Sequence, residues 1–489
     1  MKDLGRASAR GVVWNLVQNL SSRLISLLIV AVLGRMLDKS AFAAIALGLA
    51  LGVFAEILMT GGYVEFIAQR PNLTNEHFDT AFMFNVGLGA ALAGLTIAFA
   101  KPLAAAFSDE SIAPIVRWLS LSLVIRSTCV VPMGILTREM NFRALSLRTL
   151  VASIESGVAG LIAAFAGMGV YTLVLQVLLA DFTATALLWH STKWRPSWRF
   201  YPARFRELLD FGLPVIGASI LNNAARRADT FIVGASLGLV PLGLYGMGQR
   251  VFQIATVILN KSSDAVVLSA LARLADDHAR RRQAFYTAVE LTAVTCFPLY
   301  VGLAIAANPA TIVLFSSRWT DSAVVLTLFA LSGVPVSLSY LHSAAFKSTG
   351  YTRSYLVTQA AIVIIYIPLL IAVVGGGIEH AALAYLVSCV VVVPFEVWLL
   401  HAALSIDIRG YFVATFGPSL ATAVMAAAMF GVAYKTEAMI PIARLGLELA
   451  AGAIAYPVAL RLIAPTSYAR CRSIVLGFRK KPEEGAATS

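Results

Sequence analysis

The feature that most constrains this chain is a succession of apolar segments, each about as long as the roughly 20 residues that a helix needs to cross a bilayer. With 59% hydrophobic and 13% charged residues, and a mean hydropathy of +0.80, the composition lies outside that of soluble globular proteins. We therefore expect an all-α polytopic membrane protein with about 14 transmembrane helices. We place these spans at 11–36, 41–67, 79–100, 112–136, 145–167, 168–190, 211–237, 243–270, 284–307, 322–345, 355–375, 379–401, 411–434 and 440–463.

The basic residues predict an orientation for these spans. The two termini and the loops after even-numbered spans carry 24 Lys and Arg residues, counting Arg148 at the start of a span, and the opposite loops carry six. Because Lys and Arg are enriched in cytoplasmic loops, both termini are predicted to be cytoplasmic. The net charge of +12 is thereby explained without a nucleic-acid partner.

A repeated polar stripe divides the chain. Asn15, Asn19, Ser22, Arg23 and Ser26 share one helical face, and Ser219, Asn223, Arg226, Arg227 and Thr230 recur 204 residues later at the same spacing. Such parallel repeats are found among transporters. We predict a six-helix lobe at 1–190, a basic cytoplasmic linker at 191–210 and a second six-helix lobe at 211–405. Two further helices at 406–463 and a basic cytoplasmic tail at 464–489 complete this division.

The eighth span carries another polar stripe, which includes Gln249, Arg250, Gln253, Asn260 and Lys261 and ends at Asp264. Unsatisfied polar groups in hydrocarbon cost several kcal/mol each, so this face cannot contact lipid. Interhelical hydrogen bonding is one explanation. The number of charges favours the other, a water-filled cavity. Arg226 with Asp229, and Lys261 with Asp264, are spaced to pair within a helix.

Other ionisable residues in the spans carry weaker signals. Glu155, Asp181, Glu290, Glu396 and Glu448 each stand alone in their segments, where they could bind an ion or form a hydrogen bond. Arg126 is a candidate addition to the cationic lining, and Glu56 and Glu65 are candidate partners for Arg23. The histidines lie mostly at span ends, where an interfacial position explains them.

Enzyme signatures are lacking. The chain has no Walker A sequence, no H-E-x-x-H and no G-x-S-x-G, and its outward loops are short. The four cysteines, Cys129, Cys296, Cys389 and Cys471, are scattered, which predicts neither disulfides nor a metal site. We expect a transporter without cofactor or metal.

Several segments carry a family resemblance. WNLVQNLSSRL from Trp14, LGRML from Leu33, WRPSWRF from Trp194 and FRELLDFGLP from Phe205 resemble the polysaccharide-exporting flippases of the multidrug/oligosaccharidyl-lipid/polysaccharide superfamily. RADTFIVGASLGLVPLGLY from Arg227 is similar to them as well. So is LFSSRWT from Leu314, although that family more often has glycine at Ser317. The pattern covers about residues 10–400 and looks most like the Wzx-type branch, which includes succinoglycan and colanic acid exporters.

The resemblance implies a flippase of the inner membrane that moves undecaprenyl-diphosphate-linked oligosaccharides by alternating access through a cationic cavity. It also implies an H⁺ or Na⁺ gradient and a complex with polymerase and export proteins as partners, besides membrane lipids. A flippase for peptidoglycan precursors and a membrane-embedded glycan polymerase are the alternatives. A cation-drug antiporter is a weaker one, because its cavity should be acidic.

Site residues follow from the cavity and the resemblance together. Guanidinium groups bind phosphate oxygens bidentately. The expected diphosphate contacts are Arg23, Arg226, Arg227, Arg250 and Lys261. The expected sugar and polar lining is Asn19, Asn222, Asn223, Gln253 and Asn260. Asp229 and Asp264 are expected to tune charge or coupling.

Overall fold

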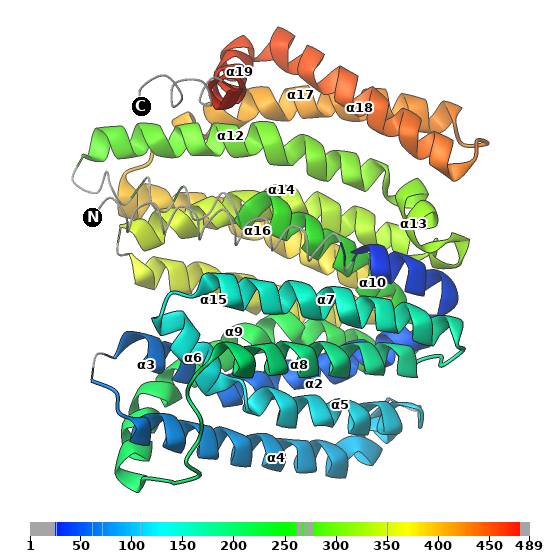
Figure 1. Cartoon of the computed structure of the whole chain (residues 1–489). Coiled ribbons are helices and arrows are strands. Elements are labelled where there is room, and N and C mark those ends of the chain that lie inside the picture. The colour runs from blue at the N-terminus through cyan, green and yellow to red at the C-terminus, as the bar shows by residue number, and fades with distance from the viewer. Residues whose placement is uncertain are drawn as a thin grey trace, which may run out of the picture. The chain divides into compact units, whose positions relative to one another are not determined.

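A computed structural model (Figure 1) describes residues 25, 27–60, 62–70, 72–107, 109–261, 267, 271, 277–349 and 351–479. Every described regular element is a helix, which confirms the predicted all-α fold. Each predicted span from 41 onward contains a described helix, and Leu27–Met36 represents the first. The described chain forms two compact units, Met1–Gly246 and Met247–Ser489. The boundary between them falls within one helix, α10 (Leu239–Thr256).

Unit 1 contains long helices that lie side by side, together with two short ones (Figure 1). Within it, α4 packs on α5, α7 on α8, and α2 on both α5 and α9. The helices after Leu27–Met36 are α2 (Lys39–Thr60), α3 (Tyr63–Gln69), α4 (Asn75–Ala106), α5 (Ile112–Ser127), α6 (Val130–Arg138), α7 (Phe142–Phe165), α8 (Tyr171–Ser191) and α9 (Pro202–Leu237).

Two predicted spans of unit 1 are broken helices. The span predicted at 41–67 stops at Thr60, and α3 begins after Gly62, whose φ of 81° favours a residue without a side chain. The span predicted at 112–136 is divided into α5 and α6, which are bent by 41°. These breaks place short helical segments at one end of unit 1, where polar side chains gather.

The predicted linker packs against unit 1. Residues 192–201 have no regular structure, and Trp194 and Trp198 stack edge-on against Phe82 of α4 at centroid distances of 5.7 and 5.5 Å. Asp79 accepts a hydrogen bond from the backbone N–H of Ser197. Helix α9 starts at Pro202, nine residues before the predicted span, because proline suits the first helical turn. The end of the predicted linker is therefore helical.

Unit 2 is built around α12, α14 and α16. Helix α12 packs on α14 and α17, α14 on α16, and α15 on α16, while α17, α18 and α19 pack in turn. Its elements after α10 are η1 (Val257–Lys261), α12 (His278–Ile305), α13 (Ala307–Phe315), η2 (Ser317–Trp319), α14 (Ser322–Ser348), α15 (Thr352–Val373), η3 (Val374–Gly376), α16 (Ile378–Leu404), α17 (Ile408–Lys435), α18 (Pro441–Ile463) and α19 (Pro465–Arg479).

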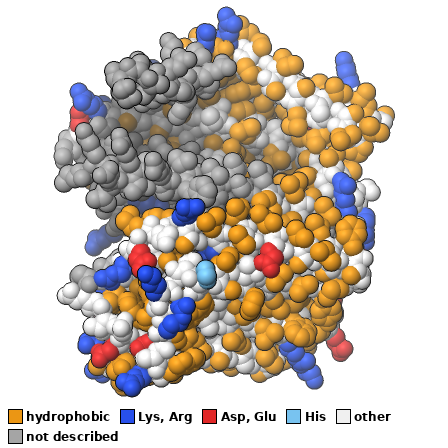
Figure 2. Space-filling view, in the orientation of Figure 1, with side chains coloured by type: hydrophobic (Ala, Val, Ile, Leu, Met, Phe, Trp, Pro, Cys, Tyr) orange, Lys and Arg blue, Asp and Glu red, His pale blue; other side chains and the backbone are white. Residues whose placement is uncertain are grey.

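Length and hydropathy qualify ten of the described helices as membrane spans, or eleven if the bent pair α5 and α6 forms one. Helices α9 and α10, which carry the predicted polar stripes, are not among them. Hydrophobic side chains cover much of the face shown in Figure 2. Such a surface is stable against lipid tails, so the chain is a multi-pass membrane protein.

Candidate functional site

The polar stripe of α9 is described at three of its predicted site residues. Asn223 and Arg227 are half-buried, and Asp229 is 4% exposed. The Asn223 amide donates to the carbonyl of Ser219, four residues earlier. Among the described side chains, the stripe therefore offers one half-buried cation, Arg227, two residues before a buried carboxylate, Asp229.

Asp229 joins α9 to α10. Its Oδ1 accepts a hydrogen bond of 2.7 Å from the backbone N–H of Thr230, and its Oδ2 accepts one of 3.2 Å from the hydroxyl of Tyr245. The bond from Tyr245 connects the two polar-stripe helices. The pairing with Arg226 that the sequence suggested stays a prediction, because the side chain of Arg226 is not described. The predicted role of Asp229 in charge tuning stays a prediction.

The stripe of α10 changes character along its length. Arg250 and Gln253 are exposed, whereas Asn260 is 3% exposed and its amide donates to the hydroxyl of Tyr300 in α12 at 2.9 Å. The helix becomes a π-helix at Val257–Lys261, a geometry that often marks functional sites. Tyr300 thus holds the widened turn in place, which the sequence did not indicate.

The remaining predicted site residues cannot be placed in the site. Asn19, Arg23 and Asp264 lie outside the described residues. Asn222, Arg226 and Lys261 lie in helices whose backbone is described but whose side chains are not. The diphosphate contacts and polar lining therefore stay predictions.

A charged cluster that the sequence did not assemble lies inside unit 1. Arg126 of α5 pairs with Glu56 of α2, Nη1 to Oε2 at 2.5 Å, and with Asp181 of α8, Nε to Oδ1 at 2.9 Å. Ser122 donates a further hydrogen bond to Asp181. Two carboxylates therefore surround the guanidinium, so Arg126 does not add an uncompensated positive charge to the predicted cavity.

Four of the five acidic residues that stand alone in sequence have partners in space. Asp181 pairs with Arg126, Glu290 with Arg470, Glu396 with His342 and Glu448 with Arg444. Glu155 of α7 is exposed. Each paired carboxylate except Glu448 takes its partner from another helix, so spacing along one helix could not reveal the pair.

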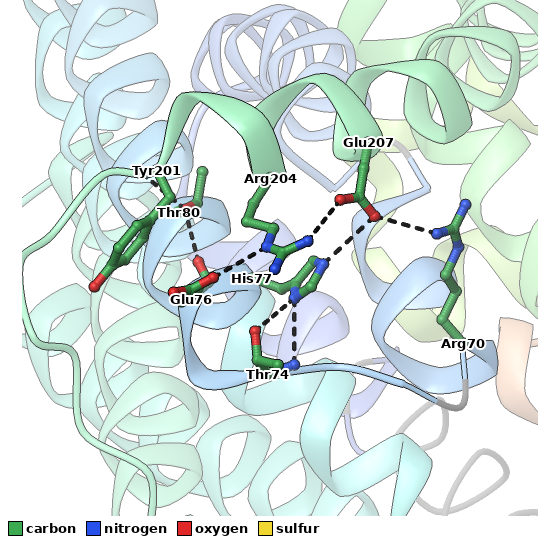
Figure 3. Close-up of polar contacts among 8 residues, drawn as sticks. All are labelled: Arg70, Thr74, Glu76, His77, Thr80, Tyr201, Arg204 and Glu207. Carbon is green, nitrogen blue, oxygen red and sulfur yellow. Dashed lines mark hydrogen bonds and ion pairs between the residues drawn. The ribbon is translucent and has the colours of Figure 1, made fainter.

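A third polar cluster lies where α3, α4 and α9 meet (Figure 3). Arg204 of α9 donates to Glu76 and Glu207 at 3.0 Å each, and Glu207 also contacts His77 and Arg70. The hydrogen bond from Arg204 lowers the pKa of Glu207, which favours its charged form. The cluster therefore attaches the start of α9 to the end of α3 and the first turn of α4.

None of these clusters resembles a metal centre. Within the described ranges, no group of three or more His, Cys, Asp or Glu side chains could hold a metal ion, and Cys129, Cys296, Cys389 and Cys471 are free thiols. What the described residues offer is ion pairing, hydrogen bonding and two polar-stripe helices.

Comparison with protein families gives one match. The model of a family described as "Polysaccharide biosynthesis protein" matches residues 32–324, more than half of the chain. The match includes α2 to α12. It therefore includes α9 and α10, the two helices that carry predicted polar stripes.

Named relatives are similar over long stretches. The teichuronic acid biosynthesis protein TuaB of Bacillus subtilis is 23% identical over 93% of this chain and 95% of the relative. The succinoglycan biosynthesis transport protein ExoT of Rhizobium meliloti is 25% identical over 66% of this chain and 65% of the relative. The lipopolysaccharide biosynthesis protein WzxC of Escherichia coli is 23% identical over 66% of each chain.

Solved structures share the fold. The lipid II flippase MurJ, in an inward closed conformation, has a TM-score of 0.72 at 15% identity, over 94% of this chain and 98% of that one. An inward-facing multidrug resistance transporter of the MATE family has a TM-score of 0.65 at 15% identity, over 80% and 99%. At these identities the likeness establishes the helical architecture alone.

Proposed function

Because this chain belongs to the polysaccharide biosynthesis protein family, we propose that it is a flippase for lipid-linked oligosaccharides. The observation that carries the proposal is the family match over residues 32–324, supported by relatives named for succinoglycan transport and for teichuronic acid and lipopolysaccharide synthesis. Its fold, shared with a lipid II flippase, suits this activity. The chain acts as a transporter and not as an enzyme.

The proposed substrate is an undecaprenyl-diphosphate-linked oligosaccharide repeat unit, for exopolysaccharide or lipopolysaccharide. A diphosphate needs cationic partners, and Arg227 and Arg250 are the described members of the predicted basic set, half-buried and exposed respectively. One guanidinium group can bind two phosphate oxygens at once, so these two arginines are the first residues to test. Amide side chains such as Asn223 and Gln253 suit the sugar hydroxyls.

The setting of this transport is also proposed. We place the protein in the inner membrane with both termini in the cytoplasm, driven by an H⁺ or Na⁺ gradient and working beside polymerase and export proteins. Alternating access would pass the sugar from the cytoplasmic to the periplasmic leaflet while the lipid tail stays in the membrane.

The test is glycan export in the organism that carries this gene, after deletion and complementation. Arg227→Ala should abolish export while the protein reaches the membrane at the normal level, and Arg227→Lys should restore only part of it, because a lysine cannot bind phosphate as a fork. The matched control is Arg461→Ala, an exposed arginine of α18, which should export normally.

Two results would overturn the proposal. Full export by both Arg227→Ala and Arg23→Ala would show that the proposed cationic site does not bind the substrate. Rescue of cells that lack their peptidoglycan-precursor flippase, with no effect of the deletion on exopolysaccharide, would assign the protein to the alternative substrate instead.

A further inference from the structure

A buried ionisable pair lies in unit 2, near the end where α14 and α16 stop and α17 begins. Glu396 of α16 accepts a hydrogen bond from His342 of α14, Nδ1 to Oε2 at 2.7 Å. Nε2 of His342 lies 3.0 Å from the hydroxyl of Tyr411 in α17. His342 is 0% exposed, and Glu396 and Tyr411 are each 3% exposed. Three helices therefore meet at one water-excluded hydrogen-bond chain.

The net charge of this hydrogen-bond chain depends on one proton. Ser339 also donates to Oε2 of Glu396, at 2.7 Å, which suits an ionised carboxylate. With a neutral imidazole, Nδ1–H donates to the carboxylate and Nε2 accepts from Tyr411, so the cluster carries one negative charge. Among the described residues, the ion-pair partner of Glu396 is this same histidine. An isolated buried charge is costly, and binding of one proton would neutralise this one.

The geometry can accept that proton without a change of rotamer. A proton arriving at Nε2 turns the bond with Tyr411 around, so that the imidazolium donates and the tyrosine oxygen accepts. The Glu396 carboxylate and the His342 imidazolium then form a neutral pair at the same 2.7 Å separation. The tyrosine hydroxyl hydrogen must turn away, which connects protonation to the first turn of α17.

A pocket lies beside this cluster. Phe285 of α12 lines the pocket and also lies against the His342 ring, at a centroid distance of 6.4 Å. Phe285 therefore borders both the pocket and the imidazole. The full lining is Leu271, Arg281, Arg282, Phe285, Ala345, Ser348, Thr349, Leu404 and Ile406.

The groups near the cluster come from four helices. Helix α12 contributes the apolar Phe285, α14 contributes Ser339 beside His342, and α17 contributes Tyr411. Helix α16 contributes the buried thiol of Cys389, which interacts electrostatically with Glu396. Charged groups occur farther out at the same end: Arg281 and Arg282 line the pocket, and the carboxylate of Asp407 caps the start of α17.

We propose that His342, Glu396 and Tyr411 form a proton-binding site that controls how the start of α17 is attached to α14 and α16. The proton reaches Nε2 from the pocket past Phe285. Loss of the proton leaves a buried negative charge, which favours movement of α17 away from the cluster. That this movement drives transport rests on the flippase function proposed above, whereas the proton site itself does not.

The first experiment needs no substrate. Infrared difference spectra of the purified full-length protein in nanodiscs, recorded at stepped pH, report carboxyl protonation and imidazole ring modes. The wild type should give an imidazole titration whose midpoint changes in Glu396→Gln, since glutamine keeps the shape but not the charge that pairs with the imidazolium. The matched control is Glu379→Gln, which removes an exposed carboxylate 3.8 Å from a histidine on the same helix and should leave the titration unchanged.

A second variant tests an effect on the titration that a merely structural role of the cluster would not produce. Ser339→Ala removes a hydrogen bond to the ionised Glu396, so the titration midpoint should differ from that of the wild type. This variant also serves if Glu396→Gln does not fold. The proposal fails if Glu396→Gln titrates like the wild type, or if the midpoint of Ser339→Ala is unchanged.

A third measurement separates the site from the function. The purified protein is placed in vesicles that contain the lipid-linked oligosaccharide, and the rate of flipping is measured. An imposed proton gradient should no longer stimulate flipping by Glu396→Gln, whereas it should still stimulate flipping by Glu379→Gln. Flipping by neither protein, together with a normal wild-type titration, would refute the flippase function and retain the proton site. Gradient-stimulated flipping by Glu396→Gln would refute the role of the site in coupling.

Discussion

Arg126 shows how one residue can hold several helices together at membrane depth. Its guanidinium reaches Glu56 of α2 and Asp181 of α8 from its own helix α5, so three helices depend on one cation. A cation between two carboxylates is expensive to remove, because the acids then repel each other in a medium poorer in water than the surface. Half-exposed side chains reduce this cost, since water screens them.

Replacing Arg126 with alanine should therefore destabilise the protein by about 1–3 kcal/mol, less than a fully buried pair would. The measurement is the midpoint of thermal unfolding of the purified protein, followed by intrinsic fluorescence. Arg126→Lys should be intermediate. Adding Asp181→Asn to Arg126→Ala should recover part of the loss, because residues in one network are not additive. Arg461→Ala is the control, and an unchanged midpoint for Arg126→Ala would contradict the prediction.

Sequence alone could say that Asp181 and Glu396 need partners, but not which ones. Both are single acids in apolar segments, and such residues almost always face protein or water. Their partners, Arg126 and His342, lie on other helices, 55 and 54 positions away along the chain. The position of His342 near a span end predicted an interfacial side chain, whereas tight packing with Phe285 and Tyr411 buries it completely.

At the scale of elements, the apolar runs located the helices well and their breaks poorly. Hydropathy averages over about 20 residues, so it detects a span but not a bend within it. The interruption at Gly62 and the 41° bend between α5 and α6 depend on two or three residues each. The early start of α9 at Pro202 was missed for the opposite reason: its first turns are polar and lie before the apolar run.

Close packing between α12 and α14 gives a prediction at this scale. A Cβ atom on Gly333 would lie 2.1 Å from the ring of Tyr300, whose hydroxyl accepts a hydrogen bond from Asn260 in η1. Gly333→Ala should therefore displace the ring and cost about 1–3 kcal/mol through overpacking. Hydrogen exchange at residues 257–261 should rise at the same time, because the displaced tyrosine releases the π-helical turn.

Two glycines provide the controls for that substitution. Gly431 of α17 and Gly446 of α18 have open space where a Cβ would be added, with no atom within 4 Å. Alanine at either position should leave the unfolding midpoint unchanged or raise it slightly, since alanine is the better helix former. A midpoint for Gly333→Ala equal to that of these two variants would show that the α12–α14 contact tolerates the extra atom.

At the scale of the whole molecule, the internal repeat and the described units place their boundaries differently. The polar stripes divide the sequence before α9, whereas contacts group α9 with α2 to α8 in unit 1. A repeat records which segments are alike in sequence, and contacts record which helices pack. Both describe one chain, in which α9 carries the second polar stripe and packs on the helices of the first unit.

Membrane orientation gives the whole-molecule prediction. Basic loops should stay in the cytoplasm, so the turn between α16 and α17 at 405–407 and the end of α19 should lie on one side, and the turn between α17 and α18 at 436–440 on the other. Alkaline phosphatase fused after residue 438 should be active, and the same fusion after residue 405 should be inactive. Green fluorescent protein should give the reverse pattern, because it becomes fluorescent only in the cytoplasm.

The basic end of the chain explains why this orientation should be robust. Helix α19 carries Arg470, Arg472 and Arg479, and Arg470 pairs with Glu290 of α12, so the cationic helix is attached to the bundle on the side predicted to face anionic lipid. Replacing these three arginines with glutamine should weaken the bias without reversing it, because the earlier loops retain their charges. Active phosphatase at residue 405 in the unaltered protein would refute the orientation, and with it the direction of flipping.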